Sequence, residues 1–176
     1  MPITTPRCAN GASQTQDASG LIFALCMATG ARVDEITSLL WKHIDLKRGT
    51  SRLGEGSAKN SEPRTLVVRG RALDRLKGYS KVQPLNKKEL VVTSSSGGLF
   101  DATKEFKKAA ASIGETATLH VCRHTWAMRL SRVSGMTMTQ IRDAGGWKSL
   151  AIVARYSHEM TDDLASKLEQ MLEAHE

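Results

Sequence analysis

The first third of the chain has the apolar spacing of helices. An unbroken apolar run from Leu21 to Ala28 predicts a buried helix that begins near Asp17. Gly30 is expected to end it, because glycine readily adopts the left-handed conformation found at helix ends. A short second helix is predicted over residues 32–41, where apolar side chains again recur at helical spacing. Residues 1–16 are polar and have no hydrophobic period, which predicts a tail or linker.

The pattern then changes to that of short strands. Residues 43–53 and 64–68 are expected to form strands, joined by a turn at Gly49 and by a polar hairpin loop that carries Lys59. This section predicts a small antiparallel sheet. Residues 89–94 are expected to be a short strand or an extended segment.

Helical patterns dominate the remainder of the chain. We predict helices over residues 70–79, 99–114, 118–133, 139–144, 150–156 and 162–174. The expected fold is therefore α+β and mostly helical, a single domain over residues 17–176 with the small antiparallel sheet on one edge.

The helix predicted over residues 118–133 has one clear buried face. At about 100° per residue, one narrow arc of this helix collects Leu119, Cys122, Trp126, Leu130 and Val133. Arg123 falls at the border of that arc, and His120 lies one turn before it on the same side. Because burial of an unpaired guanidinium is costly, we expect a negatively charged group beside Arg123.

Charge and cysteine content narrow the class of protein. The 176 residues carry a formal net charge of +7, and residues 42–108 hold 16 Lys and Arg against 7 Asp and Glu. Such a basic section favours a polyanionic partner. The three cysteines occur singly, and the longest apolar run is shorter than the roughly 20 residues of a membrane span. We expect a cytoplasmic protein without disulfides, signal peptide or membrane span.

Several polar side chains have the chemistry needed to cleave a phosphodiester. Arg32 and Arg123 can each present two planar donors to phosphate oxygens, and their charge does not titrate away. His120 and the indole N–H of Trp147 supply further donors to the same oxygens. This chemistry uses no metal ion, nucleotide or other cofactor, and none is expected.

Tyr156 is the expected nucleophile. A phenol is mostly protonated at neutral pH, so its attack needs a base, for which His120 is the candidate. Lys59 is the candidate general acid for the leaving 5′ oxygen, although Arg64 is close enough in the sequence to compete. A phosphotyrosine ester conserves the energy of the broken bond, so rejoining needs no ATP.

These motifs resemble those of the tyrosine recombinases, the phage integrase family. The family's first arginine box is matched by TGARVDEITSLLWKHID, its lysine hairpin by AKNSEPRTLVV, its His-x-x-Arg box by LHVCRHTWA and its tyrosine box by GGWKSLAIVARYSH. The resemblance implies the family's catalytic-domain fold and the breakage and rejoining of double-stranded DNA through a 3′-phosphotyrosine, in site-specific integration or excision of a mobile element. The implied catalytic residues are Arg32, Lys59, His120, Arg123, Trp147 and Tyr156, with Glu35 and His158 in support.

Two features depart from the usual family pattern. Most members have histidine at the position of Trp147, although tryptophan occurs in some active ones. Members usually also carry an amino-terminal domain that clamps the DNA, which is absent before residue 17, so we expect this chain alone to bind DNA weakly. In the family the helix matching residues 162–174 docks on a neighbouring subunit, which implies a homo-tetramer on DNA and a monomer in isolation.

Three alternatives stay open. His120 and His124 have the spacing of a zinc-binding pair, but Val121 stands where a metalloprotease has glutamate. A type IB topoisomerase would use similar chemistry to relax DNA without site preference. An accessory DNA-binding protein would keep the fold after losing catalysis.

Overall fold

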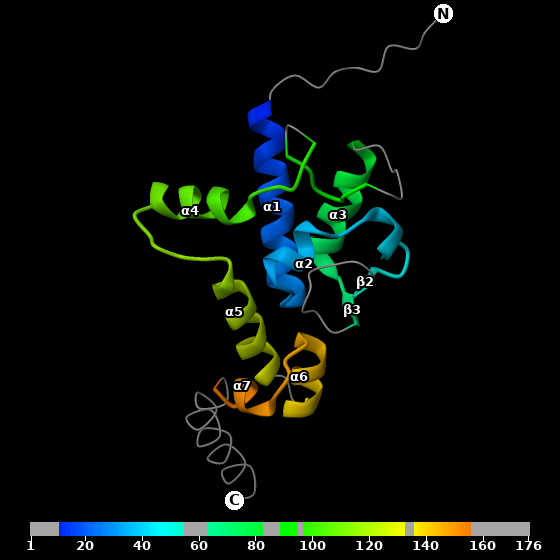
Figure 1. Ribbon diagram of the computed structural model, residues 1–176, viewed down its shortest axis with the longest axis vertical. Helices are drawn as coiled ribbons and strands as arrows, with labels where there is room; N and C mark the ends of the chain where they lie inside the picture. Colours follow the sequence, from blue (N-terminus) through cyan, green and yellow to red (C-terminus); the bar gives the residue numbers. More distant parts are fainter. Residues whose placement is uncertain (1–10, 55–62, 83–88, 95–96, 133–135, 156–176) are drawn as a thin grey trace, which may run out of the picture.

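The computed structural model describes residues 11–54, 63–82, 89–94, 97–132 and 136–155. Helix α1 (Gly11–Thr29) lies at the centre, and α2, α3, α4 and α5 all contact it (Figure 1). It begins earlier than the predicted start near Asp17. It ends as predicted at Gly30, whose φ of 63° is left-handed.

The helix predicted over residues 32–41 is much shorter in the structure. Helix α2 (Val33–Thr37) stops after five residues, and a 3₁₀ turn, η1 (Trp41–His43), follows it. The prediction of one helix was wrong because the main chain here bonds to residues 89–91 instead. Trp41 N donates to Glu89 O at 3.1 Å, and Val91 N donates to Leu39 O at 2.8 Å.

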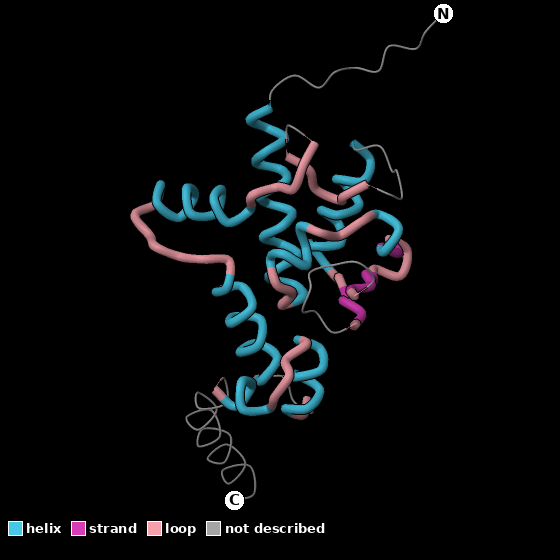
Figure 2. Tube along the Cα trace, viewed as in Figure 1, coloured by secondary structure: helices cyan, strands magenta, loops and turns pink. Residues whose placement is uncertain are grey.

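The predicted small antiparallel sheet is confirmed. It consists of β1 (Ile44–Asp45), β2 (Thr50–Leu53) and β3 (Arg64–Val67), the strands coloured magenta in Figure 2. Their order in the sheet is β1-β2-β3. Gly49, with φ of 59°, makes the turn between β1 and β2. Residues 89–94 form only an isolated bridge at Leu90 and another at Thr93, so the segment is extended rather than a strand.

The later helices lie where the sequence predicts them, within a few residues at each end. They are α3 (Gly70–Val82), α4 (Ala102–Ser112), α5 (His120–Ser131), α6 (Met138–Gly145) and α7 (Leu150–Ala154). Asp101 caps α4 by accepting a bond from Lys104 N. The helix predicted over residues 162–174 lies outside the described residues. Among the described helices, none is long and apolar enough to cross a membrane.

Two hydrophobic clusters form the interior. The larger one surrounds α1 and takes side chains from the sheet, α2, α3, α4 and the start of α5. The smaller one is built from Ala127, Ile141, Trp147 and Val153, on α5, α6 and α7 and in the turn between the last two. Helix α5 runs from the first cluster to the second (Figure 1). Side chains near the middle of α5 therefore lie where the two clusters meet.

Candidate active site

Arg32 lies directly before α2 and turns toward Glu35. Its main-chain N–H donates to Glu35 Oε2 at 2.7 Å, and its Nη1 lies 3.3 Å from Glu35 Oε1. The Arg32 side chain is nevertheless 44% exposed. Its guanidinium thus has access to solvent while one edge stays near the carboxylate.

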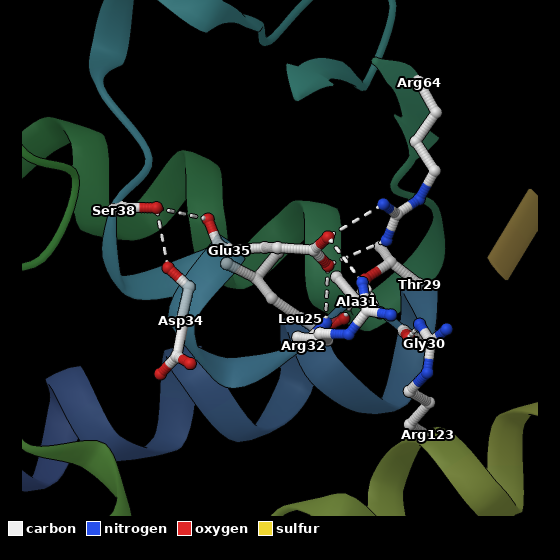
Figure 3. A network of polar contacts seen from close by, with 10 residues as sticks. All are labelled: Leu25, Thr29, Gly30, Ala31, Arg32, Asp34, Glu35, Ser38, Arg64 and Arg123. Carbon is white, nitrogen blue, oxygen red and sulfur yellow. Dashed lines mark hydrogen bonds and ion pairs between the residues drawn. The ribbon is translucent and has the colours of Figure 1, made fainter. Parts of the chain in front are cut away.

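Glu35 is a fully buried carboxylate, with 0% of its side chain exposed. Its second partner is Arg64, at the start of β3, whose Nη1 and Nη2 each donate to one carboxylate oxygen at 2.8 Å (Figure 3). Paired, parallel bonds of this kind are the strongest arrangement between arginine and a carboxylate. The buried charge of Glu35 is therefore compensated mainly by Arg64.

Arg123 is buried on α5, with 2% exposed. Its Nη1 donates to the main-chain oxygen of Gly30 at 2.5 Å, and its Cζ lies 4.0 Å from the centre of the Trp147 ring. These two partners, a carbonyl oxygen and an indole face, offer the guanidinium only partial negative charge, and the negatively charged group expected beside Arg123 stays a prediction. These contacts fix the guanidinium of Arg123 beside Gly30, which precedes Arg32 by two positions in the chain.

Two glycines make room for the tryptophans of the site. A Cβ atom at Gly30 would lie 2.2 Å from Trp126 Cε3, and one at Gly145 would lie 2.0 Å from Trp147 Cζ3. The two indole rings pack on each other with their centres 6.1 Å apart. Trp126 is thus a packing residue, as the sequence predicts. Trp147 is also buried, and its ring supports Arg123.

The contacts of the site form a closed circuit across four parts of the fold. Arg64 completes it by lying against the turn after α6, at Gly146. The approach is so close that a Cβ atom added to Gly146 would lie only 2.7 Å from Arg64 Nη1. The circuit joins the start of α2, the start of β3, the first turn of α5 and the turn after α6. In order, it passes through Gly30, Arg123, Trp147, Gly146, Arg64, Glu35 and Arg32.

The remaining predicted residues are less fully placed. His120 is the first residue of α5, exposed and one turn before Arg123. Lys59, Tyr156 and His158 lie outside the described residues, so their contacts stay predictions. The structure therefore brings Arg32, Glu35, Arg123 and Trp147 into one circuit, with His120 on the same helix as Arg123.

Sequence reasoning did not identify the main role of Arg64. It treated this arginine as a competitor of Lys59, whereas the structure shows an 8% exposed partner of Glu35. One signal was available. Glu35 follows Arg32 by three positions, and a carboxylate on the apolar side of a short helix needs a cation close by.

The charge of the circuit is positive. Arg32, Arg64 and Arg123 carry three positive charges against the single negative charge of Glu35. Arginines held in fixed positions are suited to bind an oxyanion, because their donors need no rearrangement when it binds. A phosphodiester matches both the charge and the planar donor pairs.

Comparison with known proteins shows the family to which the chain belongs. The model of the phage integrase family matches residues 8–162. A shufflon-specific DNA recombinase of Escherichia coli is 29% identical over 155 residues, covering 85% of this chain and 37% of that protein. The tyrosine recombinase XerA of Saccharolobus solfataricus is 28% identical over 163 residues, covering 90% of this chain and 51% of that protein.

Solved structures share the fold. The integrase of the Tn1549 transposon, in complex with circular intermediate DNA, matches with a TM-score of 0.69 at 16% identity, over 96% of this chain and 68% of that one. Since the family model matches most of the chain, the protein belongs to the phage integrase family. Its fold is that of the tyrosine recombinase catalytic domain. The chain spans between 37% and 51% of the length of these two curated relatives.

Proposed function

We propose that residues 17–176 are the catalytic domain of a site-specific tyrosine recombinase that acts on double-stranded DNA in the cytoplasm. The observation that carries the proposal is the contact between Arg123 and the carbonyl of Gly30. It holds the guanidinium of Arg123 against a residue that precedes Arg32 by two positions in the chain. Family membership and the recombinase relatives support it. The DNA complex of the Tn1549 integrase supports DNA as the partner.

In this mechanism Arg32 and Arg123 bind the non-bridging oxygens of one phosphate. The phosphodiester carries one negative charge, and the five-coordinate transition state carries about two, so fixed cations stabilise the transition state more than the ground state. Arg123 is suited to this role because the Gly30 carbonyl and the Trp147 ring already hold it in place.

The phenolic oxygen of Tyr156 attacks the phosphorus, and His120 accepts the phenolic proton. The bond from phosphorus to the 5′ oxygen breaks, and Lys59 protonates that oxygen as it leaves. The products are a 3′-phosphotyrosine and a free 5′-hydroxyl. Attack by a 5′-hydroxyl of another strand reverses these steps, which rejoins DNA without ATP or a metal ion.

The direct test uses nicked duplexes with a randomised centre, because the target sequence is unknown. Cleavage beside the nick releases a short oligonucleotide and traps the covalent adduct, which a denaturing gel detects and sequencing of its DNA identifies. We expect an adduct with the wild type and none with Tyr156→Phe, which still binds DNA. Arg123→Lys should slow adduct formation by about 100- to 1,000-fold.

Other results of this assay would contradict the proposal. Specific DNA binding without an adduct would identify an accessory protein that has lost catalysis. Adducts without sequence preference, together with relaxation of supercoiled plasmid, would identify a topoisomerase.

We also propose that four copies assemble on DNA through the C-terminal segment of residues 161–176. Its sequence has a helical apolar stripe formed by Leu164, Leu168, Met171 and Leu172. An apolar cavity of about 270 Å³ between α1, α4 and the start of α5 is suited to receive it from a neighbouring copy. Phe23 and Phe106, whose ring centres are 5.8 Å apart, line this cavity.

Sedimentation of the complex between the protein and its target DNA counts the bound copies and so tests this assembly. Phe23→Glu places a charge in the cavity from a side chain that is 42% exposed, so the variant should fold normally. We expect both Phe23→Glu and deletion of residues 161–176 to reduce the complex from four copies to one or two. Four copies with either variant would rule out this contact.

A further inference from the structure

Glu35 is shared unequally by its two arginines. Arg64 makes two bonds of 2.8 Å to the two carboxylate oxygens, and its side chain is 8% exposed. The guanidinium of Arg32 makes a longer contact of 3.3 Å from Nη1 alone, and its side chain is 44% exposed. Figure 3 shows the two guanidinium groups approaching the carboxylate from different sides.

A buried carboxylate pairs with the nearest cation that can bond to both of its oxygens. Desolvation makes an uncompensated buried charge costly. If Arg64 were absent, Arg32 would be the neighbour able to satisfy Glu35, because its main-chain N–H already binds Oε2 at 2.7 Å. Arg32 would then turn inward and pair with Glu35 through both of its terminal nitrogens.

We infer that Arg64 is a positioning residue for Arg32. By saturating Glu35, Arg64 leaves the guanidinium of Arg32 with donors directed outward for the phosphate of the substrate. The inference rests on the proposed function, because it assigns Arg32 a phosphate to bind. It adds a residue 32 positions away in the sequence that acts without touching the DNA.

The charge balance of the site leads to the same assignment. With Arg64 in place, the three arginines and Glu35 leave two net positive charges beside a phosphate whose transition state carries about two negative ones. Loss of Arg64 leaves one net positive charge and an Arg32 that is engaged by Glu35. Loss of Arg64 therefore removes more stabilisation of the transition state than the loss of one distant positive charge would.

The contact of Arg64 with Gly146 gives the same side chain a second anchor. Its Nη1 fits against the main chain at Gly146, one residue before Trp147, which supports Arg123. The guanidinium of Arg64 thus lies between the carboxylate of Glu35 and the main chain of the turn at Gly146. A lysine in its place would supply charge but not the flat, two-pronged shape.

The test compares cleavage of a normal phosphodiester with that of a methylphosphonate at the same position, in single-turnover reactions on the nicked duplex. A methyl group in place of a non-bridging oxygen removes the negative charge that Arg32 neutralises. We expect Arg64→Met to slow cleavage of the phosphodiester by at least tenfold. On the methylphosphonate, its rate should lie within about threefold of the wild type.

A second variant tests the role of the carboxylate. Arg64→Met/Glu35→Gln removes the group that recaptures Arg32, so it should cleave the phosphodiester faster than Arg64→Met alone. The matched control is Arg69→Met, because Arg69 lies beside the same sheet but bonds to the main-chain oxygens of Gly49 and Val68. Its rates should fall equally, or not at all, on both substrates.

Urea unfolding provides a readout that is independent of cleavage. Arg64→Met should raise the unfolding constant at least tenfold more than Arg32→Met, and Glu35→Gln should remove most of this difference. If Arg64→Met does not fold, Arg64→Lys serves in both assays, with smaller effects in the same direction.

The outcomes separate this inference from the proposed function. A wild type that forms no adduct overturns the proposed function, and the inference with it. A wild type that forms the adduct while Arg64→Met is slowed equally on both substrates overturns the inference alone, as does a double variant no faster than Arg64→Met.

Discussion

At the scale of single residues, two charged side chains of the candidate site are kept away from water. Arg123 is 2% exposed and Glu35 is fully buried. Each is held by a partner of fixed geometry, the Gly30 carbonyl for Arg123 and the guanidinium of Arg64 for Glu35. Such burial costs free energy, but it holds the donors of the candidate site in one orientation.

Gly146→Ala tests how closely the residues of the site are packed. Gly146 has a left-handed φ of 64°, and a Cβ atom there would lie 2.7 Å from Nη1 and 2.9 Å from Cζ of Arg64. Because the bonds to Glu35 hold Arg64, we expect a loss of about 2 kcal/mol or more in the free energy of unfolding. Adduct formation should slow as well. Chemical denaturation and the nicked-duplex assay measure the two effects.

Gly114→Ala is the matched control for this variant. Gly114 has a similar φ of 76°, but a Cβ atom there would meet nothing within 4 Å. It should lose only the 1–2 kcal/mol of backbone strain and keep its cleavage rate. Equal stability losses in both variants, with equal cleavage, would show that Arg64 tolerates the added methyl group.

The candidate residues of the site could be proposed from the sequence, but their partners could not. The helical period of residues 118–133 predicted Arg123 at the edge of the core, and in the structure its side chain is buried in the interior. Its contact with Gly30 joins positions 93 apart, and that of Arg64 with Glu35 joins positions 29 apart. A hydrophobic period reports which side of a helix is buried and says nothing of what lies across from it.

At the scale of elements, α1 and α5 enclose two thiols directly behind the site. Cys26 on α1 and Cys122 on α5 are both buried and free of disulfide bonds. Burial, followed by the nearby Cys122 and Glu35, raises the pKa of Cys26 to about 12. Burial also raises the pKa of Cys122. Both groups therefore stay neutral at physiological pH, where they serve as packing residues.

The raised pKa of Cys26 predicts a loss of stability in alkali. Below pH 9 the thiol is protonated in the folded and unfolded states, so its contribution is fully present. Above pH 9 the unfolded state loses the proton first, and stability falls by about 1.4 kcal/mol per pH unit until the folded pKa near 12 is reached. Cys26→Ala, less stable than the wild type at pH 7, should lose less stability in alkali, because only the contribution of Cys122 remains of the two thiols.

Urea unfolding of both proteins between pH 7 and 11 measures this difference. The gap in unfolding free energy between wild type and Cys26→Ala should narrow steadily above pH 9. A gap that stays constant up to pH 11 would show that Cys26 does not carry the shift.

Most elements could be predicted because each is specified by local signals. Gly30, Gly49 and Gly114 ended or turned elements where expected, and all three have left-handed φ values. The failure over residues 32–41 has a non-local cause. Residues 39–41 bond to residues 89–91, and Ser38 Oγ donates to Asp34 O at 2.6 Å, so the helix ends early.

At the scale of the whole molecule, the site lies where two hydrophobic clusters meet. Helix α5 crosses between them, with Cys122 in the larger cluster and Ala127 in the smaller. The circuit through Arg64 and Arg123 ties the turn after α6 to the sheet and to α2. The order of the motifs along the chain predicted this assembly only through family resemblance, because no local pattern specifies how two clusters join.

The measurement that tests the account most directly is a crystal structure of the covalent adduct trapped on nicked DNA. We expect one phosphorus atom bonded to Tyr156 Oη and to a 3′ oxygen, with the guanidinium groups of Arg32 and Arg123 both donating to its non-bridging oxygens. Arg64 should remain on Glu35, away from the DNA. An adduct on another residue, or the two arginines bound to different phosphates, would contradict the account.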